Sequence, residues 1–222
     1  MDLAKNFIEA VKHNDVETLK KHLDEDISLL YARSPEQISA FMTAIYHGHK
    51  HIADLLLRRG LTLDIFEAAA HGDVERVAEL LKEQPALLNG YSADGWTALH
   101  LAAYFGNMKV VELLLALEAD VGSYSRNPMQ VTALHSSLSN MQWDIARTLI
   151  KHGADIHAKT SGTLLMPLHY AAANGSLSIT ELLVTLGADM YARTSEGKTP
   201  LQLAVEKGRA DVAAFLQKQA TQ

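Results

Sequence analysis

Apolar residues in the middle of the chain recur at helical spacing in two short runs. The first run follows Thr97, whose hydroxyl can accept a hydrogen bond from a free N–H in the first turn of a helix. It ends at Gly106, because glycine readily adopts the positive φ that closes many helices. A second apolar run occupies residues 110–115. The pattern predicts two short helices joined at Gly106 and preceded by a turn at Asp94-Gly95.

This unit recurs along the whole chain. The residues that end each first helix are Asn14, Gly48, Gly72, Gly106, Met141, Gly175 and Gly208. The intervals between them are 34, 24, 34, 35, 34 and 33 residues, so five of the six match a period of about 33 residues. The sequence therefore predicts one repeat domain over residues 1–222. Its seven repeats are expected at 1–33, 34–61, 62–91, 92–126, 127–159, 160–193 and 194–222.

The sequences at the helix starts give the repeat its character. They read Thr97-Ala98-Leu99-His100, Thr132-Ala133-Leu134-His135, Met166-Pro167-Leu168-His169 and Thr199-Pro200-Leu201-Gln202. Together with the period, these sequences resemble the ankyrin-repeat family over the whole chain. The resemblance implies an all-α solenoid of stacked helix pairs, with finger-like turns between the pairs and a concave face. Repetition itself implies that each repeat buries its apolar face only against its neighbours.

Two departures from the family pattern lead to structural predictions. The interval that contains Leu57 and Phe66 is shorter than the others by about ten residues. We therefore expect a missing or blunted finger there, with a local change in curvature. Met141 occupies a position where the family has glycine, so a positive φ at this residue costs about 1 kcal/mol.

Composition and charge exclude several classes of function. The chain has no cysteine, which excludes disulfides, thiolate metal sites and a cysteine nucleophile. Its formal net charge of −6 argues against broad binding to nucleic acid or to an anionic membrane, because both need a basic face. The N-terminus lacks a signal pattern, and no apolar run approaches the roughly 18 residues of a spanning helix. These features predict a soluble, cytoplasmic chain.

Histidines are the principal candidates for chemistry. His100, His135 and His169 occupy one repeat position, and the resemblance implies that they are structural residues between adjacent repeats. His47 and His51 have the i, i+4 spacing of two helical metal ligands, but Gly48 interrupts the helix between them. No nucleophile elbow, phosphate-binding loop or zinc-protease motif occurs. We therefore expect no enzyme and no cofactor, with a metal or enzymatic site around His47–His51 as an alternative.

Aromatic residues gather at the positions that the family uses for partners. Trp96, Tyr104 and Phe105 fall within one repeat, between Tyr91 and Tyr124. These are five of the fourteen Phe, Trp and Tyr residues of the chain, and aromatic residues are preferred interface anchors. The full set of predicted partner-binding residues is Trp96, Tyr104, Phe105, Tyr91, Tyr124, Met129, Val131 and Tyr46. Packing between helices is the alternative for Tyr91, Tyr104 and Phe105.

The corresponding positions change character toward the C-terminus. There they hold Lys159, Asn174, Arg193, Glu196, Lys198, Glu206 and Lys207, which resemble the polar rim of an interface. The sequence predicts a non-enzymatic module that binds a protein partner on its concave face. A self-assembling homodimer that uses the same aromatic residues is the main alternative.

Overall fold

The computed structural model describes residues 3–221, and helices make up most of that range. Its α-helices are α1 (Leu3–Lys12), α2 (Val16–Glu25), α3 (Ala40–Tyr46), α4 (Lys50–Arg58), α5 (Ile65–His71), α6 (Val74–Glu83), α7 (Ala98–Phe105), α8 (Met108–Ala116), α9 (Ala133–Ser139), α10 (Trp143–Lys151), α11 (Pro167–Asn174), α12 (Leu177–Thr185), α13 (Pro200–Glu206) and α14 (Ala210–Gln219). Two 3-10 helices, η1 (Ile27–Tyr31) and η2 (Pro85–Asn89), follow α2 and α6. The predicted all-α class is confirmed.

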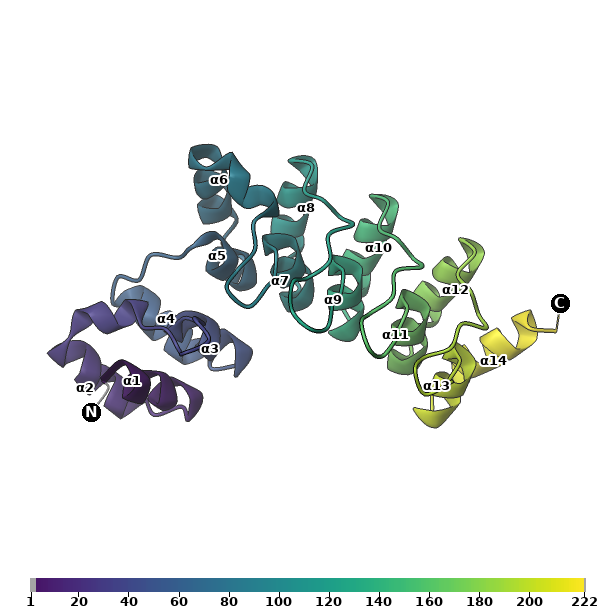
Figure 1. The fold of residues 1–222 in the computed structure, drawn as a ribbon, viewed down its shortest axis with the longest axis horizontal. Helices are drawn as coiled ribbons and strands as arrows, with labels where there is room; N and C mark the ends of the chain where they lie inside the picture. The colour runs from purple at the N-terminus through teal and green to yellow at the C-terminus, as the bar shows by residue number, and fades with distance from the viewer. Residues whose placement is uncertain (1–2, 222) are drawn as a thin grey trace.

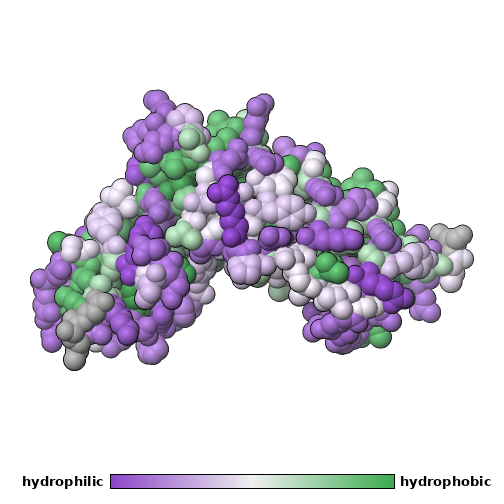
Figure 2. Space-filling view, viewed as in Figure 1, coloured by the Kyte–Doolittle hydropathy of each residue, from purple (hydrophilic) through white to green (hydrophobic). Residues whose placement is uncertain are grey.

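Consecutive helices form pairs that stack side by side into an arch (Figure 1). From α5 onward the odd-numbered helices lie along the lower side of the view and the even-numbered helices α6 to α12 lie along the upper side. We call α3, α5, α7, α9, α11 and α13 the inner helices. The space-filling view shows that the molecule is hollowed along the lower edge of the same arch (Figure 2). The solenoid that the repeat pattern predicts is therefore present.

Local caps explain where the inner helices begin and end. The Thr97 hydroxyl accepts a hydrogen bond from His100 N–H at 3.3 Å and begins α7. Gly106 ends α7 with φ at 83°, and its N–H donates to Ala102. Met141 has φ at 56°, so this position has the left-handed backbone although it holds no glycine.

Each finger is closed by one backbone hydrogen bond across its base. The N–H groups of Ser92, Ser125, Thr160 and Thr194 donate to the carbonyls of Trp96, Val131, Leu165 and Lys198, at 2.8 to 3.0 Å. Neighbouring fingers are also joined to one another. The donor–acceptor pairs are Arg126 N to Gly95 O, Ser161 N to Met129 O and Ser195 N to Thr163 O. The fingers of residues 91–198 therefore form one continuous, backbone-bonded edge.

The connection between α4 and α5 has no such finger. Residues 59–64 form a short connection that ends at Asp64. The Asp64 carboxylate accepts from the N–H groups of Phe66 and Glu67 at 2.9 Å and caps the start of α5. The prediction of a missing finger is confirmed. At this point the first two helix pairs, α1 to α4, are turned away from the line of the later pairs (Figure 1).

The core consists of aliphatic residues that repeat from pair to pair. Leu99, Leu134 and Leu168 occupy one repeat position and are at most 2% exposed. A continuous buried cluster extends from Phe7 to Ala188, so every pair is packed against its neighbours. None of the helices described over residues 3–221 is long and apolar enough to cross a membrane.

Candidate partner-binding site

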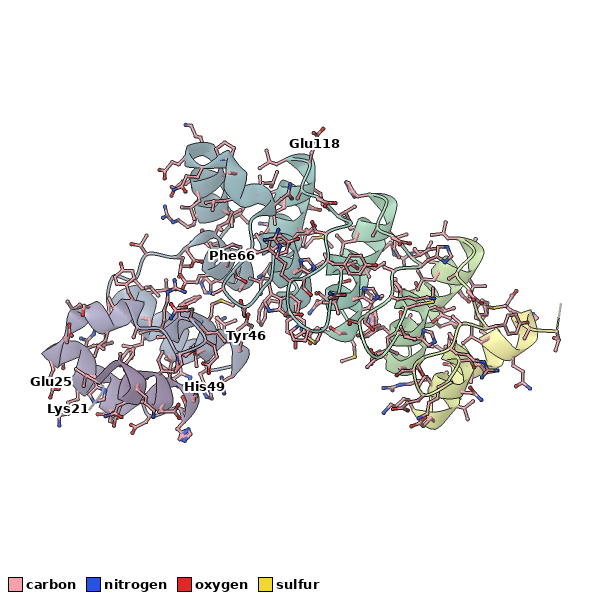
Figure 3. The ribbon with its side chains drawn as sticks, viewed as in Figure 1. Lys21, Glu25, Tyr46, His49, Phe66 and Glu118 are labelled. Atoms are coloured by element: carbon pink, nitrogen blue, oxygen red, sulfur yellow. The ribbon has the colours of Figure 1, made fainter. Side chains whose placement is uncertain are left out.

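A pocket of about 340 Å³ opens between the inner helices and the fingers of the middle repeats. The residues that line it are Tyr46, Trp96, His100, Leu101, Tyr104, Phe105, Met129, Val131, His135, Ser136, Ser139 and Tyr170. They are aromatic, aliphatic or small and polar, and none is Asp, Glu, Lys or Arg. Figure 3 shows Tyr46 on the hollowed side of the arch, while Glu118 lies at the opposite, upper end of α8. The pocket has the size and composition of a site for an apolar group.

Six of the eight predicted partner-binding residues line this pocket. They are Tyr46, Trp96, Tyr104, Phe105, Met129 and Val131. Met129 is 52% exposed, Tyr104 41% and Tyr46 38%, so these side chains are available to a partner. Val131 is only 7% exposed, and its position is in the buried wall of the pocket. The structure therefore brings together residues from three separate repeats.

Tyr91 and Tyr124, which were also predicted to bind the partner, do not line this pocket. The Tyr91 hydroxyl donates to the Tyr124 carbonyl at 3.1 Å. The guanidinium of Arg126 lies 3.9 Å from the centre of the Tyr91 ring, at cation–π distance. The physical reason is that both tyrosines sit at the bases of their fingers, where their contacts connect one finger to the next.

The packing alternative holds in part for Phe105, and Trp96, for which packing was not predicted, is held in a similar way. The Phe105 ring lies 6.1 Å from Tyr46 and 5.0 Å from Tyr104, between centroids, and the Trp96 ring lies 5.8 Å from His100. Phe105 and Trp96 also pack against the small buried cluster of Met42, Ala70 and Leu101. Both residues are half-buried, so they support the pocket wall and still contribute to its surface.

A short hydrogen bond fixes Tyr46 at the edge of the pocket. Its hydroxyl donates to Asp94 Oδ2 at 2.6 Å, across a separation of 48 residues. Burial raises the pKa of Tyr46, and the bond to Asp94 raises it further. Tyr46 therefore remains protonated at neutral pH and connects α3 to the finger that contains Trp96.

Two of the three repeated histidines, His100 and His169, form hydrogen bonds to the next repeat, as the resemblance implied. His100 contacts the Thr97 hydroxyl at 2.7 Å through Nδ1 and the Val131 carbonyl at 2.9 Å through Nε2. A carbonyl can only accept, so Nε2 carries the proton. His169 Nε2 likewise lies 3.1 Å from the Ala192 carbonyl, while its Nδ1 accepts from Met166 N–H at 3.1 Å, because Met166 replaces the capping threonine. Burial lowers the pKa of His100 to about 4, which keeps the imidazole neutral at neutral pH.

His135 differs from the other two histidines. Its Nδ1 accepts from Thr132 N–H at 3.2 Å, so its proton also lies on Nε2. This Nε2–H is buried beside the backbone of Leu165 and Ala158, outside strict hydrogen-bond geometry. Burial lowers the pKa of His135 to about 4 as well. The pocket wall thus contains a second neutral histidine, whose Nε2–H is turned away from solvent.

The described residues give no support to a metal site at His47–His51. The ring centroids of His47 and His49 are 5.8 Å apart, and those of His49 and His51 are 6.3 Å apart. His47 Nδ1 contacts the Thr43 carbonyl, and His49 Nε2 contacts the Lys12 carbonyl. Over residues 3–221, no three His, Asp or Glu side chains are grouped closely enough to hold a metal ion. These histidines belong to a polar turn between α3 and α4.

Sequence reasoning missed three pocket residues that share one repeat position. Leu101, Ser136 and Tyr170 each follow one of the three repeated histidines, and all three line the pocket. The histidine side chain points toward the next finger, so the next residue of the helix lies on an adjacent part of the inner surface. The sequence shows that these residues share a repeat position. They were missed because the position holds a different residue type, Leu, Ser or Tyr, in each repeat.

Comparison with known proteins agrees with this geometry. A family model described as "Ankyrin repeats (3 copies)" matches residues 65–160 and 162–222. Protein phosphatase 1 regulatory subunit 27 of Mus musculus is 37% identical over 84 residues, which are 38% of this chain and 53% of that protein. Ankyrin repeat and SAM domain-containing protein 6 of Rattus norvegicus is 30% identical over 131 residues, which are 53% of this chain and 14% of that protein.

A third relative belongs to a different class of protein. NAD-capped RNA hydrolase NUDT12 of Homo sapiens is 36% identical over 64 residues, which are 29% of this chain and 14% of that protein. The chain therefore spans about half the length of the phosphatase regulatory subunit and a small part of the other two relatives.

Proposed function

This chain belongs to the ankyrin-repeat family, and we propose that it is a non-enzymatic module that binds a protein partner in the pocket on its hollowed side. The observation that carries the proposal is the uncharged pocket of about 340 Å³, with Met129, Tyr104 and Tyr46 partly exposed around it. Exposed aromatic and apolar groups beside a concave site favour an interface. We also place the module in the cytoplasm.

The rigidity of the scaffold supports this proposal. Backbone hydrogen bonds join each finger to the next, and the Tyr46–Asp94 bond holds one side of the pocket. A site whose side chains are already ordered loses less entropy when a partner binds. The relative named as a regulatory subunit of protein phosphatase 1 is consistent with a role in binding another protein. Homodimerisation through the same pocket is the alternative, and solution mass by light scattering distinguishes it.

The test is affinity capture from a lysate of the source organism with the wild type and two single variants. Trp96→Ala removes a half-buried ring from the pocket, and we expect it to weaken binding of the captured partner by about 2 kcal/mol or more. Lys151→Ala, on the exposed end of α10, is the control. Both variants must first show the wild-type circular dichroism spectrum and melting temperature. Equal losses of partner affinity for the two variants would show that the interface lies outside the pocket.

A further inference from the structure

Exposed cations lie on three consecutive fingers next to the pocket. Arg126, Lys159 and Arg193 are all exposed, and no carboxylate of residues 3–221 forms an ion pair with any of them. Arg126 rests on the Tyr91 ring, and Arg193 donates to the Gly197 carbonyl at 2.7 Å. The charge of all three groups therefore remains unneutralised, although the chain as a whole has a net charge of −6.

The finger hydrogen bonds connect these cations to the pocket. Met129 lines the pocket, and its carbonyl accepts from Ser161 N–H at 3.0 Å, so the next finger lies directly beside it. Lys159 is two residues before Ser161 on that finger. The following finger is joined in the same way, and Arg193 lies two residues before its bonded residue, Ser195. The basic row thus continues from the pocket along the bonded edge of the fingers.

Several acidic groups near this row are bonded within the chain; Asp155 and Asp189, which precede Lys159 and Arg193, accept from backbone N–H groups at 2.8 Å. Glu196 and Glu206 both pair with Lys198, at 3.2 and 2.7 Å. Asp94 accepts hydrogen bonds from the hydroxyls of Tyr46 and Ser92, both at 2.6 Å. The inner helices α7, α9 and α11 contain no Asp, Glu, Lys or Arg. Hydrophilic side chains are prominent over the middle and right of the face in Figure 2, where the fingers lie.

One unpaired polar hydrogen of the pocket wall also favours an acceptor. The Trp96 indole N–H has no acceptor among the described residues. An indole N–H is a donor only, so it cannot bind a donor from a ligand. The pocket and the finger row therefore favour the same ligand chemistry: an apolar body with oxygen acceptors and negative charge on one side.

We propose that the partner presents a single peptide segment with one large apolar side chain for the pocket and adjacent acidic residues for Arg126, Lys159 and Arg193. This inference rests on the proposed function, because it specifies the chemistry of the partner at the same site. Burial of the apolar side chain stabilises the complex, and the carboxylates orient the peptide along the fingers. Exposed charge pairs of this kind accelerate association and weaken as salt increases.

A display library of random 12-residue peptides tests the proposal. It is panned on the wild type, on a pocket variant (Tyr104→Ala/Met129→Ala), on a charge variant (Lys159→Glu/Arg193→Glu) and on a matched control (Lys109→Glu/Lys151→Glu). The control changes the net charge equally, but its residues are on the exposed ends of the outer helices α8 and α10. All four proteins must have the same helical spectrum and melting temperature within a few degrees.

We expect the peptides enriched on the wild type to combine a large apolar residue with several Asp or Glu residues. For a synthetic copy of an enriched peptide, the charge variant should raise Kd about tenfold or more, while the control should change it less than about twofold. The pocket variant should also lose binding. Raising the salt concentration should weaken the wild type more than the charge variant.

The remaining outcomes separate the two proposals. Peptides that need the pocket but show no acidic bias would overturn the charge inference and leave the proposed function standing. Peptides that bind the pocket variant as well as the wild type, or no enrichment at all, would overturn both. A single-stranded oligonucleotide that binds and is lost with the charge variant would assign the basic row to phosphate and overturn the acidic peptide. Self-association that blocks the pocket would replace the peptide with a second copy of the chain.

Discussion

Two junctions between repeats are built from opposite chemistry, although the same repeat positions meet in both. The first is the junction between the α3–α4 pair and the α5–α6 pair, which has no finger and which we call the fingerless junction. The second, between the α7–α8 pair and the α9–α10 pair, contains the finger that ends at Val131, and we call it the fingered junction. The difference lies in the third residue of each inner helix, where the family has histidine.

In the fingered junction this residue is His100, which reaches forward. Its Nε2–H donates to the Val131 carbonyl of the following finger at 2.9 Å. The backbone bond from Arg126 to Gly95 and the bond from Asn140 Nδ2 to the Tyr104 carbonyl, at 2.7 Å, complete the connection. A neutral imidazole suits this position because it accepts on one side and donates on the other.

In the fingerless junction the same positions hold Met42 and Glu67. No finger follows Met42, so a histidine there would have no carbonyl for its N–H. Glu67 cannot donate to a carbonyl when ionised, and it reaches backward, where it accepts from the Ser39 hydroxyl at 2.5 Å. Its other oxygen accepts from Asp64 N–H at 2.9 Å. The residue at this position is thus matched to the groups that the neighbouring repeat provides.

The largest expected effect comes from breaking the fingerless junction at Glu67. Glu67→Ala leaves the buried Ser39 hydroxyl and the Asp64 N–H without an acceptor, so we expect a loss of about 4 kcal/mol. Because repeats communicate only through their neighbours, urea unfolding followed by circular dichroism should become biphasic. Glu79→Ala, which removes an exposed ion pair with Arg76, is the control. A single transition with no loss of stability would show that this junction does not depend on Glu67.

The second effect distinguishes the two junctions by their pH dependence. Burial lowers the pKa of His100 from 6.5 to about 4. Between these values the unfolded chain takes up a proton that the folded chain does not, so the free energy of unfolding falls as the pH falls. For Glu67 the burial and the nearby Asp64 carboxylate raise the pKa above 4.5. The free energy of unfolding that this raised pKa contributes is therefore complete below pH 4.5 and declines as the pH rises.

His100→Gln removes the histidine part of this dependence. We expect the difference in stability between wild type and variant to shrink by about 3 kcal/mol between pH 7.5 and pH 4. Urea unfolding curves at four pH values measure it. His152→Gln, at an exposed position after α10, is the matched control. Parallel curves for wild type and His100→Gln would contradict a depressed pKa at His100.

The sequence predicted the architecture because the information is local and repeated. The caps at Thr97 and Gly106, the left-handed Met141 and the missing finger after Arg58 all follow from turn chemistry and interval lengths. Six pocket residues were also predicted, since they occupy repeat positions. Tyr91 and Tyr124 do not line the pocket, because they contact each other and Arg126 on two fingers whose packing no local pattern specifies.

Glu67 stands where the family has histidine. The sequence did not predict the role of this glutamate, and the physical reason is the same. Its hydrogen-bond partner, Ser39, is 28 residues away and belongs to the repeat on the other side. The family model matches from residue 65 onward, which leaves the first two pairs outside the match but includes Glu67. The fingerless junction lies at the edge of that match, and specific side-chain contacts explain it better than the repeat pattern does.

The smallest effect tests the comparison most directly, because it introduces histidine where no finger follows. Met42→His places a polar ring at a position that is 7% exposed, packed against Ala70 and Leu101. Nothing corresponds there to the Val131 carbonyl, so we expect a loss of about 2 kcal/mol from the unpaired N–H and the lost apolar contact. Met42→Leu conserves volume and should cost less than about 1.5 kcal/mol. Equal stability of Met42→His and Met42→Leu at pH 7.5 would contradict this expectation. A histidine at this position would then need no carbonyl from a following finger, and the missing finger would not explain the difference between the two junctions.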